Sequence, residues 1–136
     1  MGVRWDEVAV VSAGGILGAL GRHGIGLLAP TAPGGFPWST FAINVAGCAA
    51  IGILMVFATE VWSPHRLIRP FLTVGVLGGF TTFSAYAAEA RDLLAIGAVG
   101  VAVGYVVGTV LAALVAVQCG VVVARRVASG GRGTIR

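Results

Sequence analysis

Four long stretches without a full charge constrain this chain more than any other feature of its sequence. Crossing the hydrocarbon core of a bilayer takes roughly 20 apolar helical residues. A segment rich in proline and glycine at residues 30–37 places a turn near the start of the second stretch. The sequence therefore predicts an all-α integral membrane protein with four transmembrane helices, over residues 8–28, 39–62, 71–90 and 93–124. The stretches lie between Glu7 and Arg22, between His23 and Glu60, between Arg69 and Glu89, and between Asp92 and Arg125.

The composition agrees with a membrane protein, because 57% of the residues are hydrophobic, only 10% are charged and the mean hydropathy is +0.97. In this prediction residues 1–124 form the transmembrane domain and leave no room for a soluble one. Residues 125–136 are basic and glycine-rich, and we expect them to be a disordered cytoplasmic tail. The net charge of +4 lies largely in this tail and in the loops, so it indicates lipid headgroups and topology and not nucleic-acid binding.

The middle of the third predicted helix, residues 78–84, reads Gly-Gly-Phe-Thr-Thr-Phe-Ser. Glycine loses the most backbone entropy on ordering, and threonine is stiff at χ1, so this segment favours a break in the helix. Backbone freed by a break inside a bilayer must find partners in protein, water or an ion, and transporters and channels tend to bind ions at such places. The alternative is a continuous helix whose small residues pack against a neighbour.

Two polar residues stand out in the first two predicted helices. Arg22 lies near the end of the first, where it either snorkels to the interface or faces an aqueous vestibule and concentrates anions. Asn44 is the strongly polar residue of the second and makes either an interhelical hydrogen bond or a donor that lines a pore. Gly14 and Gly18 are four residues apart, so they share a helix face and allow close approach of another helix.

The last two helices carry aromatic and hydroxyl side chains at helical spacing. Phe83 and Tyr86 lie on one face, where they either belong to the core or turn positive ring edges toward an anion. Glu89, at the end of the third helix, is assigned to the interface. Tyr105 and Thr109 form a hydroxyl stripe, which either lines a narrow path or satisfies neighbouring backbone. Beside it a seam of small residues predicts close helix packing: Gly100, Gly104, Gly108 and Ala112.

Taken together, these segments resemble the CrcB family of bacterial fluoride channels, also called Fluc. The matching motifs occupy three of the four predicted helices in the order and spacing of that family, and the resemblance covers most of the chain. They are Gly14-Gly15-x-x-Gly18-Ala19-x-x-Arg22, Thr40-x-x-x-Asn44-x-x-Gly47, and Gly78-Gly79-Phe80-Thr81-Thr82-Phe83-Ser84 through Glu89.

The resemblance implies a dual-topology dimer with two antiparallel subunits and two fluoride pathways along their interface. It also implies a structural sodium ion at the centre, held by the backbone carbonyls of Gly78 and Thr81 from each subunit. Phe83 and position 86 supply the aromatic edges of the pathway, and Asn44 donates to fluoride. The implied pathway residues are Asn44, Phe83, Ser84, Tyr86, Tyr105, Thr109 and Arg22. The sequence departs from the family at two positions, since Tyr86 replaces a phenylalanine and Ala85 a threonine.

The function that follows is passive export of fluoride across the cytoplasmic membrane, and not an enzymatic activity. A second hypothesis is a small four-helix, proton-coupled multidrug antiporter, and a third is a structural subunit of a larger membrane complex. Proton-coupled antiport generally uses a carboxylate inside the bundle, and no Asp or Glu lies between Glu7 and Glu60. The antiporter is therefore disfavoured.

The arginines also predict an orientation. With four helices, the N-terminus, the loop near His65 and the C-terminal tail share one side, which we expect to be cytoplasmic because short arginine-rich loops stay inside. A homodimer of antiparallel subunits needs a sequence without such a bias. We therefore expect the inverted partner to be a second CrcB-like chain. The seven arginines of the rich side are Arg4, Arg66, Arg69, Arg125, Arg126, Arg132 and Arg136, and the other side has Arg22 and Arg91.

Overall fold

The computed structural model describes residues 4–61 and 65–130, and every element within them is helical. Two segments are π-helical: η1 (Phe57–Val61) continues α2, and η2 (Phe71–Val76) joins α3 to α4. The α-helices are α1 (Trp5–Leu28), α2 (Trp38–Val56), α3 (Ile68–Pro70), α4 (Leu77–Phe80), α5 (Phe83–Ala95) and α6 (Val99–Gly130).

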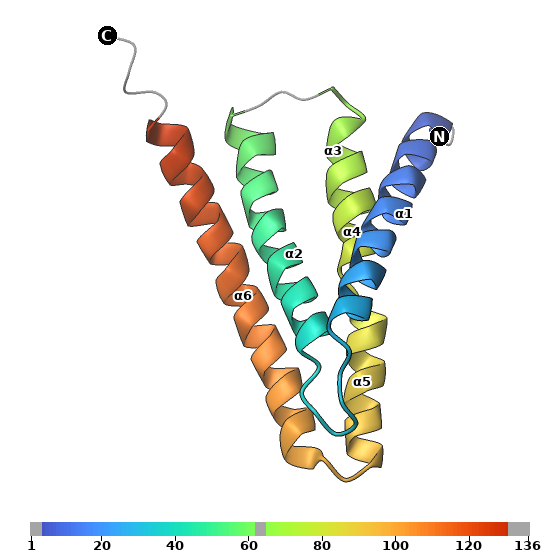
Figure 1. Ribbon diagram of the computed structural model, residues 1–136. Helices are drawn as coiled ribbons and strands as arrows, with labels where there is room; N and C mark the ends of the chain where they lie inside the picture. The colour runs from blue at the N-terminus through green and yellow to red at the C-terminus, as the bar shows by residue number, and fades with distance from the viewer. Residues whose placement is uncertain (1–3, 62–64, 131–136) are drawn as a thin grey trace.

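These elements make four helical spans that are long and apolar enough to cross a membrane: Trp5–Leu28, Trp38–Glu60, Ile68–Ala95 (the third span) and Val99–Gly130. Successive spans run in opposite directions, so the start of α1, the end of α2 and the end of α6 lie at one end of the molecule (Figure 1). The prediction of an all-α protein with four membrane-spanning helices is confirmed.

The connection between the third and fourth spans lies further along the chain than predicted. The prediction ended one helix at residue 90 and began the next at 93, whereas α5 continues to Ala95 and α6 begins at Val99. The prediction placed the turn at charged residues, but Arg91 and Asp92 are exposed on α5 and leave its backbone hydrogen bonds intact. The turn forms instead at Gly97, whose φ of 79° suits glycine and disfavours other residues.

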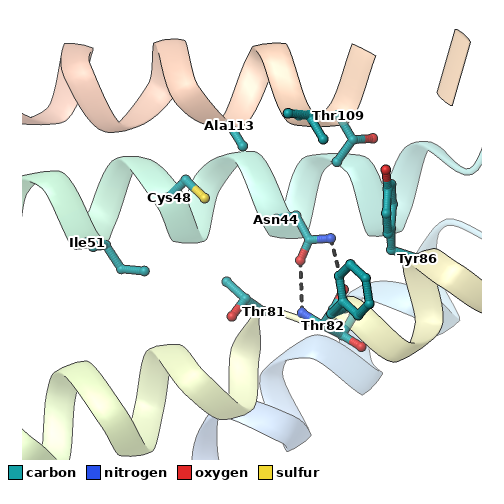
Figure 2. A pocket seen from close by; sticks show the side chains of 10 residues that line it. Asn44, Cys48, Ile51, Thr81, Thr82, Tyr86, Thr109 and Ala113 are labelled. Atoms are coloured by element: carbon teal, nitrogen blue, oxygen red, sulfur yellow. Dashed lines mark hydrogen bonds between the residues drawn. The ribbon is translucent and has the colours of Figure 1, made fainter. Parts of the chain in front are cut away.

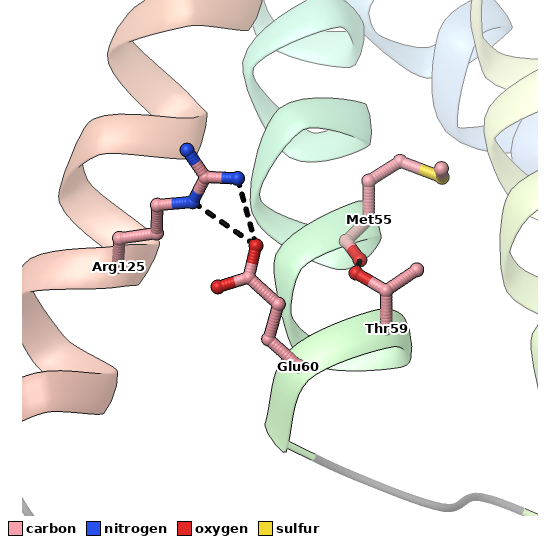
Figure 3. Close-up of polar contacts among 4 residues, drawn as sticks. All are labelled: Met55, Thr59, Glu60 and Arg125. Carbon is pink, nitrogen blue, oxygen red and sulfur yellow. Dashed lines mark hydrogen bonds and ion pairs between the residues drawn. The ribbon is translucent and has the colours of Figure 1, made fainter.

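The last helix is also longer than predicted, because α6 extends to Gly130. The expectation of disorder from residue 125 onward is wrong for residues 125–130, and residues 131–136 lie outside the described part of the chain. Arg125 pairs with Glu60 at 2.8 Å and so ties the end of α6 to η1 (Figure 3). The hydroxyl of Ser129 donates to the carbonyl of Arg125 at 2.8 Å, one turn back on the same helix.

Glycines bring the backbones of α1 and the third span into contact. A Cβ atom at Gly14 would lie 2.6 Å from the carbonyl oxygen of Phe71, and one at Gly75 would lie 2.8 Å from that of Val11. Gly18 and Gly79 likewise face backbone of the opposite helix. The predicted close approach at Gly14 and Gly18 is confirmed. This contact fixes the position of α1 along the axis of the third span.

The second close contact joins α2 and α6 through Gly52 and Gly120, each of which faces a backbone carbonyl of the other helix. The seam predicted on the first half of α6 is different. At Gly100, Gly104 and Gly108 an added Cβ would meet no atom of residues 4–61 and 65–130 within 4 Å, so this face is open in the described part of the chain. Small residues allow close packing but do not specify which helix packs there.

Candidate functional site

The middle of the third span is not helical. Helix α4 ends at Phe80, and the next two residues are extended, with φ and ψ of −74° and 153° at Thr81 and −146° and 120° at Thr82. These two residues, called the extended pair below, are the central positions of the 28-residue span Ile68–Ala95. Thr82 caps α5, because its hydroxyl accepts from the backbone N–H of Ala85 at 3.1 Å.

Asn44 of α2 binds both backbone groups of Thr82. Its Nδ2 donates to the Thr82 carbonyl at 3.1 Å, and its Oδ1 accepts from the Thr82 N–H at 2.9 Å (Figure 2). In a bilayer these two groups would otherwise lack partners at this depth. The amide therefore makes the interhelical bond that was one of its two predicted roles, and it retains one N–H that these two bonds do not use.

Arg22 of α1 also binds this segment. Its Nε donates to the carbonyl of Gly79 at 3.2 Å. The N–H and the hydroxyl of Thr81 both donate to the carbonyl of Leu77, each at 2.9 Å. Within residues 4–61 and 65–130, the hydrogen bonds that hold this segment thus use the carbonyls of Leu77, Gly79 and Thr82. The carbonyls of Gly78 and Thr81 are not among them.

A groove of about 280 Å³ opens beside the extended pair (Figure 2). It brings together four of the predicted pathway residues, Asn44, Phe83, Tyr86 and Thr109, which come from three different spans. Phe83 is 79% exposed and stands at the edge of the chain. The groove is lined by Asn44, Cys48, Ile51, Thr81, Thr82, Phe83, Tyr86, Thr109, Val110 and Ala113.

The two aromatic side chains beside the groove differ in how they are held. The Tyr86 hydroxyl donates to the carbonyl of Val106 on α6 at 3.0 Å, and its ring lies 5.2 Å from that of Tyr105. Phe83 has a ring contact with Tyr86 at 5.7 Å. The hydroxyl that distinguishes Tyr86 from a phenylalanine is therefore bound to backbone, and the ring contributes to the groove wall.

A second cavity, of about 350 Å³, lies toward the end of the molecule that carries the α1–α2 and α5–α6 loops. Arg22, His23, Thr40, Thr82 and Glu89 are among its lining residues. Thr82 lines both this cavity and the groove. The two spaces therefore meet the extended pair at the same residue.

Glu89 was assigned to the interface, but it is partly buried and accepts two hydrogen bonds. The hydroxyls of Thr40 and Tyr105 donate to its two carboxylate oxygens at 2.8 Å and 2.7 Å. The sequence analysis missed this cluster. The available signals were the spacing of Thr40 and Asn44, which places them on one helix face, and that of Tyr86 and Glu89.

Ser84 and Tyr105 do not line the groove, and Thr109 lines it with a hydroxyl that is buried. Ser84 is exposed, does not line the groove and bonds the Thr82 hydroxyl at 3.2 Å. Tyr105 is fully buried, with its hydroxyl on Glu89. Thr109 is 5% exposed, and its hydroxyl has no hydrogen-bond partner within the described residues. Gly78 is exposed, with open space where a side chain would begin.

Comparisons with known proteins agree with the motifs. The chain is 59% identical to "Fluoride-specific ion channel FluC 2" of Nocardia farcinica over 115 residues, which cover 85% of this chain and 82% of the relative. It is 53% identical to "Fluoride-specific ion channel FluC 1" of Streptomyces coelicolor, over 88% of this chain and 78% of the relative. A third relative, "Fluoride-specific ion channel FluC 2" of Thermobifida fusca, is 48% identical over 84% of each chain.

These relatives are named as ion channels, so the expectation of a multi-pass membrane protein that is not an enzyme is confirmed. The family model for "CrcB-like protein, Camphor Resistance (CrcB)" matches residues 9–121. That segment contains the whole groove, the extended pair and both side chains that hold it. The chain belongs to the CrcB-like protein family.

Proposed function

We propose that this chain is one subunit of a fluoride channel that exports fluoride passively from the cytoplasm and so lowers its toxicity. Hydrogen fluoride enters a cell as a neutral acid and ionises there, and the channel returns the anion. The observation that carries the proposal is the groove, in which Asn44, Phe83 and Tyr86 lie beside the extended pair. The printed names of the relatives support fluoride as the transported ion.

The chemistry of these side chains suits a small and strongly hydrated anion. Fluoride crosses only if many weak donors replace its water in series, and none may hold it too tightly for release. Asn44 offers a neutral N–H, and aromatic ring edges at Phe83 and Tyr86 carry partial positive charge. Thr82 lines both this groove and the cavity beside Arg22 and Glu89. These spaces are the proposed path through one half of the channel.

A single chain leaves this path incomplete, which supports an antiparallel dimer. The groove is open on one side, and Phe83 is largely exposed beside it. Polar groups such as those of Asn44 and Thr82 are costly when they face lipid. A partner subunit would cover them and supply the missing wall. The open glycine face of α6 offers further surface for close contact between helices.

The proposed helix break at the extended pair would also supply a central sodium site. The hydrogen bonds of this segment leave out the carbonyls of Gly78 and Thr81, as well as that of Phe80. Backbone carbonyl oxygens are hard ligands that suit a monovalent cation. Gly78 is exposed, and among the described residues an added Cβ there would meet no atom within 4 Å. Two antiparallel copies of the segment would therefore offer four carbonyls to one ion, which would be structural rather than transported.

Fluoride efflux from liposomes that contain the purified protein tests the function. The expected result is electrogenic fluoride release without a proton gradient and with chloride excluded. If the lone chain is silent, it is co-reconstituted with a second CrcB-like chain. Silence in both preparations, with dimers present on size exclusion, would contradict the channel. The antiporter is not favoured, because the relatives are named as channels, and it would require transport that collapses with the proton gradient.

A further inference from the structure

We propose that Arg22 is a positioning residue for the extended pair, and not a charge that attracts the transported anion. This inference rests on the proposed channel function. Its basis is the hydrogen bond that Nε of Arg22 donates to the carbonyl of Gly79. The two residues lie 57 positions apart in the sequence. Arg22 lines the cavity next to the extended pair, but its bonded nitrogen is directed to the backbone.

The end of α4 needs a partner of this kind. The last carbonyls of a helix have no intrahelical donor and carry partial negative charge. An arginine near a helix C-terminus can donate a hydrogen bond to one of these carbonyls, and its positive charge interacts favourably with their partial negative charge. Arg22 lies six residues before the end of α1, or about 9 Å along the helix axis. A backbone carbonyl without a partner is costly inside a bilayer, so a protein donor is worth more there than at the surface.

The extended pair is thus held from two helices at once. Arg22 of α1 binds the carbonyl before it, at Gly79, and Asn44 of α2 binds both backbone groups of Thr82. The contact of Gly79 with the backbone of Gly15 sets the register, because Gly15 is two turns before Arg22 on α1. Loss of the Arg22 bond frees the end of α4 and lets Gly79 and the neighbouring carbonyls turn.

Three substitutions separate positioning from attraction of anions. Arg22→Gln places an amide N–H where Nε stood, because both nitrogens follow the same number of side-chain carbons, and it removes the charge. Arg22→Met has nearly the same length as the glutamine variant and donates nothing. Arg22→Lys keeps the charge and moves the donor beyond that position. Positioning requires the donor, whereas attraction of anions requires the charge.

The readouts are fluoride efflux over a range of fluoride concentrations and hydrogen exchange of the backbone in residues 77–86. We expect Arg22→Gln to retain efflux within about twofold and Arg22→Met to lose roughly tenfold or more in maximal efflux. The half-saturating fluoride concentration should not change in either. Exchange should be faster in the Met variant and similar to the parent in the Gln variant. This second readout does not depend on transport, so it tests the hydrogen bond even if the proposed function fails.

Other results would overturn the proposal. If Arg22→Lys matches the parent while Gln and Met are equally impaired, more so at low ionic strength, then Arg22 attracts anions. If all three variants match the parent in efflux and exchange, the bond has no role. Should Arg22→Met fail to form dimers, the comparison of Gln with Lys decides, because the two proposals rank these variants in opposite order.

Discussion

Asn44 shows how one side chain at the residue scale can have two roles. Its amide makes two hydrogen bonds with Thr82 and also lines the groove. In the first role, the amide gives the backbone N–H and carbonyl of Thr82 the hydrogen-bond partners that lipid cannot supply. In the second, its remaining N–H would donate to an anion in the groove. Glu89 of α5 is a similar case. Its carboxylate accepts hydrogen bonds from hydroxyls of α2 and α6, and so it joins three helices.

The Asn44→Asp variant tests both roles of the amide. Aspartate has no N–H, so the Thr82 carbonyl loses its donor, which costs about 1–3 kcal/mol for a buried group. Its negative charge also repels fluoride. We expect efflux to fall to background, with dimers weakened but present by size exclusion. Cys48→Ala is the control, since Cys48 lines the same groove. An Asp variant that conducts like the parent would place Asn44 outside the path.

At the scale of elements, backbone contact between helices positions the site. The glycines of α1 and the third span let Arg22 reach Gly79, because the two helices could not approach so closely with side chains between them. The glycine pair of α2 and α6 holds the opposite wall of the groove in the same way. The open glycines of α6 have no such partner among the residues that the structure describes.

Adding a single methyl group to α1 tests how much the contact between α1 and the third span contributes to stability. In Gly18→Ala the Cβ atom would meet the carbonyl of Val76 and lie 2.7 Å from the backbone nitrogen of Phe80. Neither can move without shifting the third span, so we expect a loss of about 1–3 kcal/mol in stability. Thermal unfolding in detergent measures it.

The matched control is Gly24→Ala on the same helix, where an added Cβ meets no atom within 4 Å. Alanine is the better helix former by about 1 kcal/mol, so this variant should be unchanged or slightly more stable. Equal melting temperatures for Gly18→Ala and the parent would mean that α1 does not pack here as described.

The whole molecule has two unlike ends. The start of α1, α3 and the end of α6 lie at one end of the molecule (Figure 1). Five arginines belong to these segments or lie just before them: Arg4, Arg66, Arg69, Arg125 and Arg126. Three of them form ion pairs there, with Glu7, Asp6 and Glu60. Acidic partners contribute little to the orientation in which helices insert. We therefore expect the predicted bias toward one orientation to persist despite these pairs.

We predict that the chain, expressed alone, inserts with both termini in the cytoplasm. Accessibility tags at the two termini measure this directly, and a parallel sample with a second CrcB-like chain tests for a heterodimer. Neutralising Arg4, Arg66 and Arg69 together should produce a mixture of orientations. Termini on both sides of the membrane for the parent, together with robust fluoride efflux by the lone protein, would refute the heterodimer.

The number of spans, the membrane class and the close approach at Gly14 and Gly18 were determined by the sequence alone, because hydropathy and four-residue spacing are local patterns. The position of the last turn and the length of α6 were not, since charged residues interrupt an apolar pattern without ending a helix. Only the tertiary structure decided that Arg22 binds Gly79, that Asn44 binds Thr82 and that Glu89 accepts from Thr40. These partners are 57, 38 and 49 positions apart. Such pairs form only where glycine contacts have fixed the position of each helix along the axis of its neighbour. No local sequence pattern encodes that relative position.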